Sequence, residues 1–292
     1  MSTLSPRTIG LEPWPTGLVD DLMVVHRHNG DALGTVVCVH GTLDRAGSFA
    51  RMARRLDGAD VVAYDRRGYQ GSRTAGASNA LGNHVHDLLA VINVVRSGGP
   101  VTVVGHSFGG VVSLAAALAA PGAIDNLVLY EPPLPWLASS PPPLRGVPLT
   151  DEPHLEVERF FRRMVSSDSW DRLSEVDRAD RIADGPALVG DLNIVRLETP
   201  FTLDDVADLS CPLTVVLGSA SALSHHAEAA MELSAIPAHG QWCSIEGAGH
   251  GAHLTHPDHL AAIIAETITA LNESHVLDSH TNDTPKETTC AS

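Results

Sequence analysis

Two polar residues, Ser107 and His250, have the types and the chain order needed for nucleophilic catalysis. Ser107 lies in Gly-His-Ser-Phe-Gly, between an apolar run and an alanine-rich run. A sharp strand-to-helix turn would expose its hydroxyl, and the glycines would admit close-packed backbone. A serine needs a base, and His250 in Gly-Ala-Gly-His is the candidate. The alternative is that Ser107 merely caps a helix.

Acyl-transfer chemistry also needs backbone donors for the negative charge that develops on the reacting oxygen. Thr42 follows His40-Gly41 directly after an apolar run. We expect the amides of Thr42 and Phe108 to form this oxyanion hole, at the amino end of the helix that begins after Ser107. His40 is expected to hold the loop in place.

The elements that would position these residues alternate between strand-like and helix-like runs. Near-continuous apolar runs are typical of parallel strands that are covered on both faces. An antiparallel strand is expected first, at 21–28. The pattern predicts an α/β fold with a mostly parallel twisted sheet and helices on both faces. Predicted parallel strands are 35–41, 61–65, 101–106, 127–131, 213–218 and 241–247, and predicted helices are 48–56, 81–95, 111–120, 224–233 and 258–271.

One segment, 132–205, interrupts this alternation and is interpreted as an inserted cap. It contains a proline cluster, expected to be extended, and short amphipathic helices around Phe160, Phe161 and Met164. The core is then formed by 1–131 and 206–272. The polar tail, 273–292, is expected to lack regular structure.

Together, the His-Gly near Gly41, the Gly-His-Ser-Phe-Gly segment and the late Gly-Ala-Gly-His resemble the α/β-hydrolase superfamily over roughly residues 24–271. The resemblance implies a serine–histidine–acid triad, acyl-transfer chemistry and no requirement for a cofactor or metal. The superfamily also includes lyases, cofactor-free oxygenases and receptors without catalytic activity.

The acid of the triad is not where the resemblance would place it. Members usually carry Gly-x-x-Asp after the penultimate strand, but here the stretch ends at Ser221. Some members, such as certain haloalkane dehalogenases, place the acid at the end of the strand that follows the helix after the nucleophile. Glu131 lies at the corresponding position in this chain. Two prolines after Glu131 would fix its direction. Glu131 is therefore the expected acid, with Asp204, Asp205 and Asp208 as weaker alternatives.

The composition of this 292-residue chain argues against some classes of binding partner. Its net charge of −16 disfavours nucleic acid and anionic membranes. No signal peptide or membrane span is expected, which predicts a cytoplasmic protein; the oligomeric state stays open. A metal site at His253, His256 and His259 is conceivable, but exposed or supporting histidines are the preferred interpretation, so no metal is expected.

The predicted function is a serine hydrolase that cleaves a small, largely apolar ester, lactone or related acyl compound. Epoxide hydrolases and haloalkane dehalogenases of this superfamily resemble the chain but carry aspartate at the position of Ser107. A serine at this position excludes their chemistry. The alternative is a non-hydrolytic member, namely a lyase, cyclase or acyltransferase of secondary metabolism or a ligand-binding protein.

Overall fold

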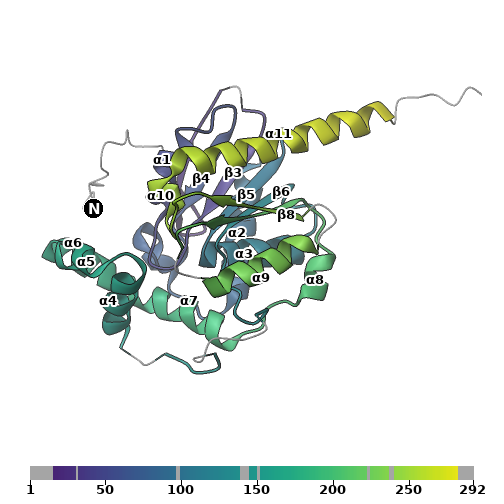
Figure 1. Ribbon diagram of the computed structural model, residues 1–292. Helices are drawn as coiled ribbons and strands as arrows, with labels where there is room; N and C mark the ends of the chain where they lie inside the picture. The colour runs from purple at the N-terminus through teal and green to yellow at the C-terminus, as the bar shows by residue number, and fades with distance from the viewer. Residues whose placement is uncertain are drawn as a thin grey trace, which may run out of the picture.

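The computed structural model describes residues 16–30, 32–96, 99–138, 145–149, 152–221, 224–236 and 240–281 (Figure 1). An eight-stranded sheet runs through the molecule in the order β1-β2-β4-β3-β5-β6-β7-β8. Strands β3 to β8 are parallel, and β2 pairs antiparallel with β1 and β4. The predicted fold class is confirmed. The strands are β1 (Thr16–Val19), β2 (Leu22–Arg27), β3 (Thr35–Val39), β4 (Asp60–Tyr64), β5 (Val101–His106), β6 (Asn126–Tyr130), β7 (Leu213–Gly218) and β8 (Gly240–Ile245).

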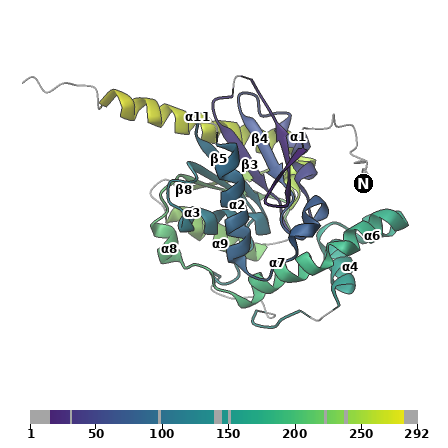
Figure 2. The same ribbon diagram turned by 180° about the vertical axis from the view of Figure 1, so that it is seen from behind.

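Helices cover both faces of the sheet, as Figures 1 and 2 show, with α11 on one side and α2, α3 and α9 on the other. Two separate apolar cores result, one on each face. The helices of the α/β core are η1 (Ala46–Phe49), α1 (Ala50–Ala53), η2 (Gln70–Ala75), α2 (Leu81–Val95), α3 (Phe108–Ala119), α9 (Ser224–Ala235), α10 (Ala252–Thr255) and α11 (Pro257–Thr281).

The central strands are buried along their whole length because helices cover them on both sides. Every residue of β3, β4, β5 and β6 is buried. This explains the near-continuous valine and leucine runs of the sequence. The edge strand β8 is partly exposed, and Trp242 faces solvent there.

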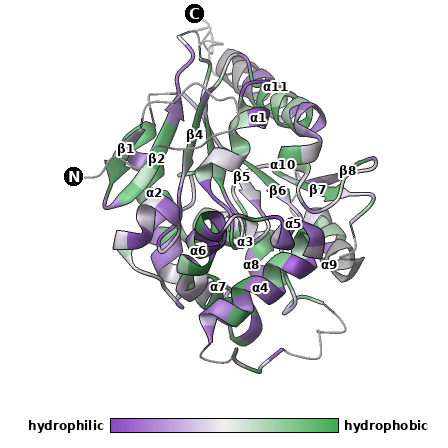
Figure 3. Cartoon of the chain, turned by 90° about the vertical axis from the view of Figure 1, so that its left-hand side faces the viewer, coloured by the Kyte–Doolittle hydropathy of each residue, from purple (hydrophilic) through white to green (hydrophobic). Residues whose placement is uncertain are grey.

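Between β6 and β7 the chain forms a group of helices at the carboxyl edge of the sheet (Figure 1). Figure 3 shows many hydrophilic residues along α4, α5 and α6. Their apolar side chains form a third core, in which Phe161 and Trp170 are buried. Residues 139–144 of the proline cluster lie outside the described residues. These helices are α4 (Pro153–Met164), α5 (Ser167–Asp171), α6 (Glu175–Ala183) and α7 (Gly185–Leu197). The short helix α8 (Leu203–Ala207) follows them and directly precedes β7.

The expectation of an irregular tail from Glu273 is wrong for 273–281, because α11 continues to Thr281. Neither glycine nor proline occurs between Asp258 and Thr281, so the sequence contains no residue that would end the helix. Residues 282–292 lie outside the described part of the chain. Although α11 has 25 residues, neither it nor any other helix in the described ranges is long and apolar enough to cross a bilayer.

Strand β1 was not predicted. It pairs with β2 through a turn at Asp20 and Asp21, which have φ values of 48° and 66°. Positive φ at both central positions is the geometry of a two-residue hairpin. Glycine or asparagine usually signals such a turn, and two aspartates do not.

Candidate active site

Ser107 occupies a strained turn between β5 and α3. Its φ is 52° and its ψ −125°, a conformation rare for a residue with a side chain. The flanking glycines are required by contact: a Cβ on Gly105 would lie 2.6 Å from the Cα of Gly110, and one on Gly109 would collide with the Val39 carbonyl oxygen. The amide of Ser107 donates to the carbonyl of Tyr130 on β6, 2.9 Å away. The backbone is therefore held in the geometry of a nucleophile elbow.

Glu131, directly after β6, is bonded to His250. Glu131 Oε2 lies 2.6 Å from His250 Nδ1, as expected from the sequence. Oε1 accepts the Gly218 amide at 2.8 Å, and Oε2 also accepts the Ser221 hydroxyl at 3.0 Å. Because a carboxylate only accepts, His250 Nδ1 carries a proton in this bond and Nε2 can act as a base. Ser221, at the usual place of the acid, thus supports an acid that comes from another strand.

The hydroxyl of Ser107 is not hydrogen-bonded to His250 in the described part of the chain. His106, which directly precedes Ser107 in the chain, nevertheless contacts His250. The rings of His106 and His250 are 4.9 Å apart, and His106 Nε2 lies 2.8 Å from the His250 carbonyl oxygen. In a serine–histidine pair without substrate, the hydrogen bond is often long and shortens when substrate binds.

The charges of the acid–base pair are set by burial and by the hydrogen bonds. Burial alone raises the pKa of Glu131, but the bonds from His250, Gly218 and Ser221 bring that pKa below its usual value. Burial lowers the pKa of His250, and the bond to Glu131 only partly offsets this effect. At neutral pH the pair is therefore a carboxylate and a neutral imidazole, which is the state a general base requires.

The loop after β3 lies against the elbow. A Cβ on Gly41 would be only 2.8 Å from the Cβ of Ser107, so a side chain there would push the loop away. The amides of Thr42 and Phe108 have no acceptor among the described residues. Both are therefore available for an oxyanion, and the amino end of α3 adds a favourable dipole at Phe108.

His40 holds the loop after β3 in place through two hydrogen bonds. Its Nε2 accepts the amide of Arg66 at 2.8 Å, and its Nδ1 donates to the Gly41 carbonyl at 2.7 Å. Burial, helped by the charge of Arg66, lowers the pKa of His40 to about 3, so the imidazole stays neutral. The structural role expected for His40 fits these contacts.

Arg66 and Asp191 form a buried ion pair that was not predicted from the sequence. Arg66 Nη1 lies 3.0 Å from Asp191 Oδ1, and Nη2 lies 2.5 Å from Oδ2. Asp191, on α7, also accepts the hydroxyls of Thr42 at 2.9 Å and of Tyr69 at 2.6 Å. The guanidinium donates in addition to the His40 and Gly41 carbonyls. Helix α7 is thereby tied to the loop that carries Thr42.

The alternative acids lie away from His250. Asp205 caps α8, where its carboxylate accepts the amide and the hydroxyl of Thr202. Asp204 and Asp208 are exposed on the same short segment. None of the three is bonded to His250, whose carboxylate partner among the described residues is Glu131.

A second polar group, formed by Asp44, His106 and His253, lies beside His250. Each residue places one potential metal-ligand atom within 4.8 Å of the others. His253 is 2% exposed, so it supports the site from the interior and is not a surface histidine. His256 and His259 contact each other, with ring centroids 6.1 Å apart. The three histidines spaced by three residues therefore do not form one cluster.

In a comparison with known proteins, the sequence pattern of the alpha/beta hydrolase family fits residues 36–263. Lipase LipV of Mycobacterium tuberculosis is 33% identical over 108 residues, which are 37% of this chain and 41% of that protein. The match thus spans about two fifths of the length of this curated relative.

Solved structures share the fold at low sequence identity. A bromoperoxidase from Bacillus anthracis has a TM-score of 0.66 at 18% identity, over 89% of this chain and 100% of that chain. The enol-lactonase from Burkholderia xenovorans has a TM-score of 0.65 at 18% identity, over 87% and 100%. With the family pattern spanning both Ser107 and His250, the chain belongs to the alpha/beta hydrolase family.

Proposed function

We propose that this protein is a serine hydrolase that cleaves a small, largely apolar ester or lactone through an acyl-enzyme. The observation that carries the proposal is the 2.6 Å bond between His250 Nδ1 and Glu131, beside an elbow that presents Ser107. A buried carboxylate that orients an imidazole next to a serine is the arrangement that activates a hydroxyl.

In the proposed first step, Ser107 Oγ attacks the carbonyl carbon and its proton passes to His250 Nε2. Glu131 stabilises the imidazolium that forms, and the amides of Thr42 and Phe108 stabilise the oxyanion. His250 then gives its proton to the departing alkoxide, which leaves the acyl group on Ser107. A water molecule then attacks this ester and gives its proton to His250. His250 returns the proton to Ser107 Oγ as the bond between the acyl carbon and Oγ breaks, and the acid product is released.

We call residues 40–45, the loop after β3 that carries Thr42, the oxyanion loop. The apolar residues around this loop support a small apolar substrate. Leu43 follows Thr42 and packs with Phe161 and Trp170 of the helices at the carboxyl edge. The partial match to a lipase agrees with an ester substrate. A chain of net charge −16 also disfavours strongly anionic substrates.

A fluorophosphonate probe combined with a panel of esters and lactones of varied chain length tests the proposal. We expect covalent labelling of the native protein at Ser107, detected by intact mass, and hydrolysis of at least one acyl class. Ser107→Ala should abolish labelling and lower turnover by about 10³-fold or more while the fold is kept. A Ser107→Ala variant that retains most of its turnover would exclude this mechanism.

A second candidate function is non-hydrolytic, either as a lyase, cyclase or acyltransferase or as a ligand-binding protein. It is favoured by the absence, within the described residues, of a hydrogen bond between Ser107 and His250. A ligand-binding protein would leave Ser107 unlabelled. A lyase or acyltransferase would be labelled but would release no acid product from any member of the panel.

A further inference from the structure

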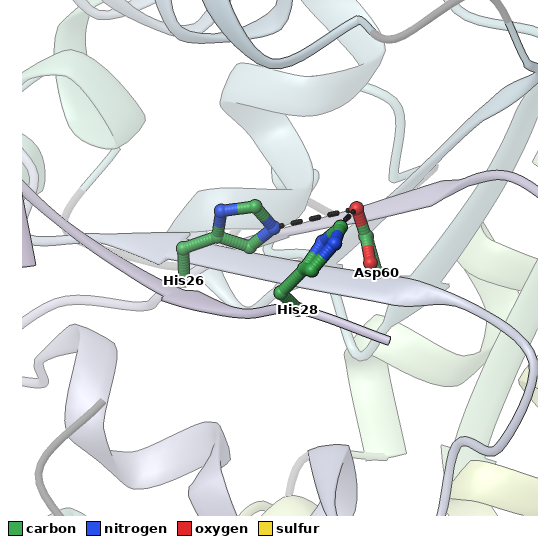
Figure 4. Close-up of side chains that lie close together, drawn as sticks. All are labelled: His26, His28 and Asp60. Atoms are coloured by element: carbon green, nitrogen blue, oxygen red, sulfur yellow. Dashed lines mark hydrogen bonds and ion pairs between the residues drawn. The ribbon is translucent and has the colours of Figure 1, made fainter. Parts of the chain in front are cut away.

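Two histidines and an aspartate meet at the opposite end of the sheet from Ser107. Figure 4 shows His26 and His28 beside the carboxylate of Asp60. His26 Nε2 lies 3.5 Å and His28 Nδ1 lies 3.0 Å from the same oxygen, Asp60 Oδ2. One potential ligand atom of each residue lies within 4.8 Å of the other two.

Strand geometry brings the three side chains together. His26 and His28 are two residues apart, so an extended chain points them to the same face. In the antiparallel register, Arg27 pairs with Val61, which places His28 opposite Asp60 at the start of β4. Arg27, between the two histidines, turns to the other side and donates to the Leu56 carbonyl.

The aspartate is oriented toward the imidazoles by the backbone. The amide of Asn29 donates to Asp60 Oδ1 at 2.7 Å, which leaves Oδ2 directed at both rings. Such a bond to the distal oxygen is typical of carboxylates that bind metals. His26 Nε2 is buried and has no hydrogen-bond partner, although it is 3.5 Å from Oδ2. His26 Nε2 therefore carries either a lone pair or a proton for which the described residues offer no hydrogen-bond partner.

From this geometry we propose that His26, His28 and Asp60 bind a divalent transition metal, with Zn²⁺ as the fitting ion. Zinc takes imidazole nitrogen and carboxylate oxygen at about 2.0–2.2 Å, which separates tetrahedral ligands by about 3.4 Å. The two nitrogen–oxygen distances of 3.0 and 3.5 Å bracket this separation. With neutral imidazoles the cluster carries the single negative charge of Asp60, and the fourth position is left for water.

The site is structural in position and not part of the hydrolytic centre. Asp60 begins β4, and the oxyanion loop and elbow lie beyond the carboxyl ends of the strands; five strand residues span about 13 Å. A metal here would join β2 to β4, and an ion that binds only the folded state raises its stability. Bound metal is therefore expected to raise the melting temperature and to leave ester turnover unchanged.

The experiment uses the full chain without a histidine tag and titrates it with Zn²⁺, by calorimetry and by thermal melting. Co²⁺ provides a second probe, because its visible absorption reports tetrahedral ligation. We expect one ion per chain and a rise in melting temperature. His28→Ala should weaken affinity by more than about 100-fold, and His26→Ala should do the same. His28 is largely exposed, so its removal leaves the fold intact.

Two controls separate this site from other histidines. His86→Ala removes an exposed histidine of α2, and His256→Ala removes one of the contacting pair on the opposite face; both should bind Zn²⁺ as the native protein does. Native affinity in both His26→Ala and His28→Ala would overturn the proposal. So would binding that is lost only in His253→Ala, since the ion would then occupy the group around Asp44.

Discussion

Glu131 receives three hydrogen bonds, from His250, Ser221 and the amide of Gly218. We expect Glu131→Gln to lower kcat/KM by about 10⁴-fold, because an amide favours the wrong imidazole tautomer. Asp205→Asn is the matched control: it removes a carboxylate that only caps α8, and the rate should stay native. The measurement is steady-state kinetics on one ester. Equal losses of kcat/KM in the two variants would show that Glu131 is not the acid of the triad.

The protonation of His250 predicts the acid limb of the pH profile. The base acts only when neutral, and burial brings its pKa below the usual value of 6.5. Activity should therefore fall as the pH drops through this lowered pKa, with the midpoint of the acid limb below pH 6.5. In Glu131→Gln the residual activity should show a limb at still lower pH, because the carboxylate raises the pKa of His250. An acid limb above pH 6.5 in the native protein would contradict this assignment.

Helix α7 is joined to the oxyanion loop through the buried Arg66–Asp191 pair, which is 1% and 0% exposed. Asp191→Ala leaves the Arg66 charge buried and unpaired, so we expect unfolding to become easier by about 3–5 kcal/mol. Urea denaturation measures this change. Replacing both residues, as Arg66→Met with Asp191→Leu, should cost less than Asp191→Ala alone.

Asp171→Ala is the control for this prediction. It removes the exposed partner of Arg162, and the urea midpoint should not move. Since Thr42 Oγ1 donates to Asp191, the Asp191→Ala variant should also show a lower kcat at temperatures where it remains folded. If the destabilised variant kept a native kcat, the ion pair would stabilise the fold without positioning Thr42.

The elements that carry clear local signals were predictable, and those that depend on distant contacts were not. Glu131 could be expected because a strand ends there and Ser221 occupies the usual acid position. That Ser221 would donate to Glu131 needed the pairing of β6 with β7. Asp191 lies 125 residues after Arg66, and nothing in its helical surroundings distinguishes it from a surface aspartate.

At the scale of the whole molecule, the helices at the carboxyl edge are packed on the oxyanion loop through Leu43, Phe161 and Trp170. Phe161→Ala should change the ratio of rates for short and long acyl chains, because it leaves a cavity in the apolar core that contains Leu43, the neighbour of Thr42. The matched control is Val176→Ala on α6, which is 78% exposed. Unchanged ratios in both variants, with Ser107 still labelled by a fluorophosphonate, would assign specificity to the loops of the core.

The position of the acid after β6 has an evolutionary consequence for the loop after β7. The end of β7 supplies the amide of Gly218, and the loop that follows supplies one hydroxyl, from Ser221. A side chain at 218 would collide with the carbonyl oxygen of Ala248, whereas threonine at 221 would provide the same hydroxyl as serine. Under the proposed function, selection constrains Glu131 and Gly218 strictly and position 221 weakly. Related sequences with the same acid are free to diverge there, while a chain that loses Glu131 must regain a carboxylate at 221 to keep its base oriented.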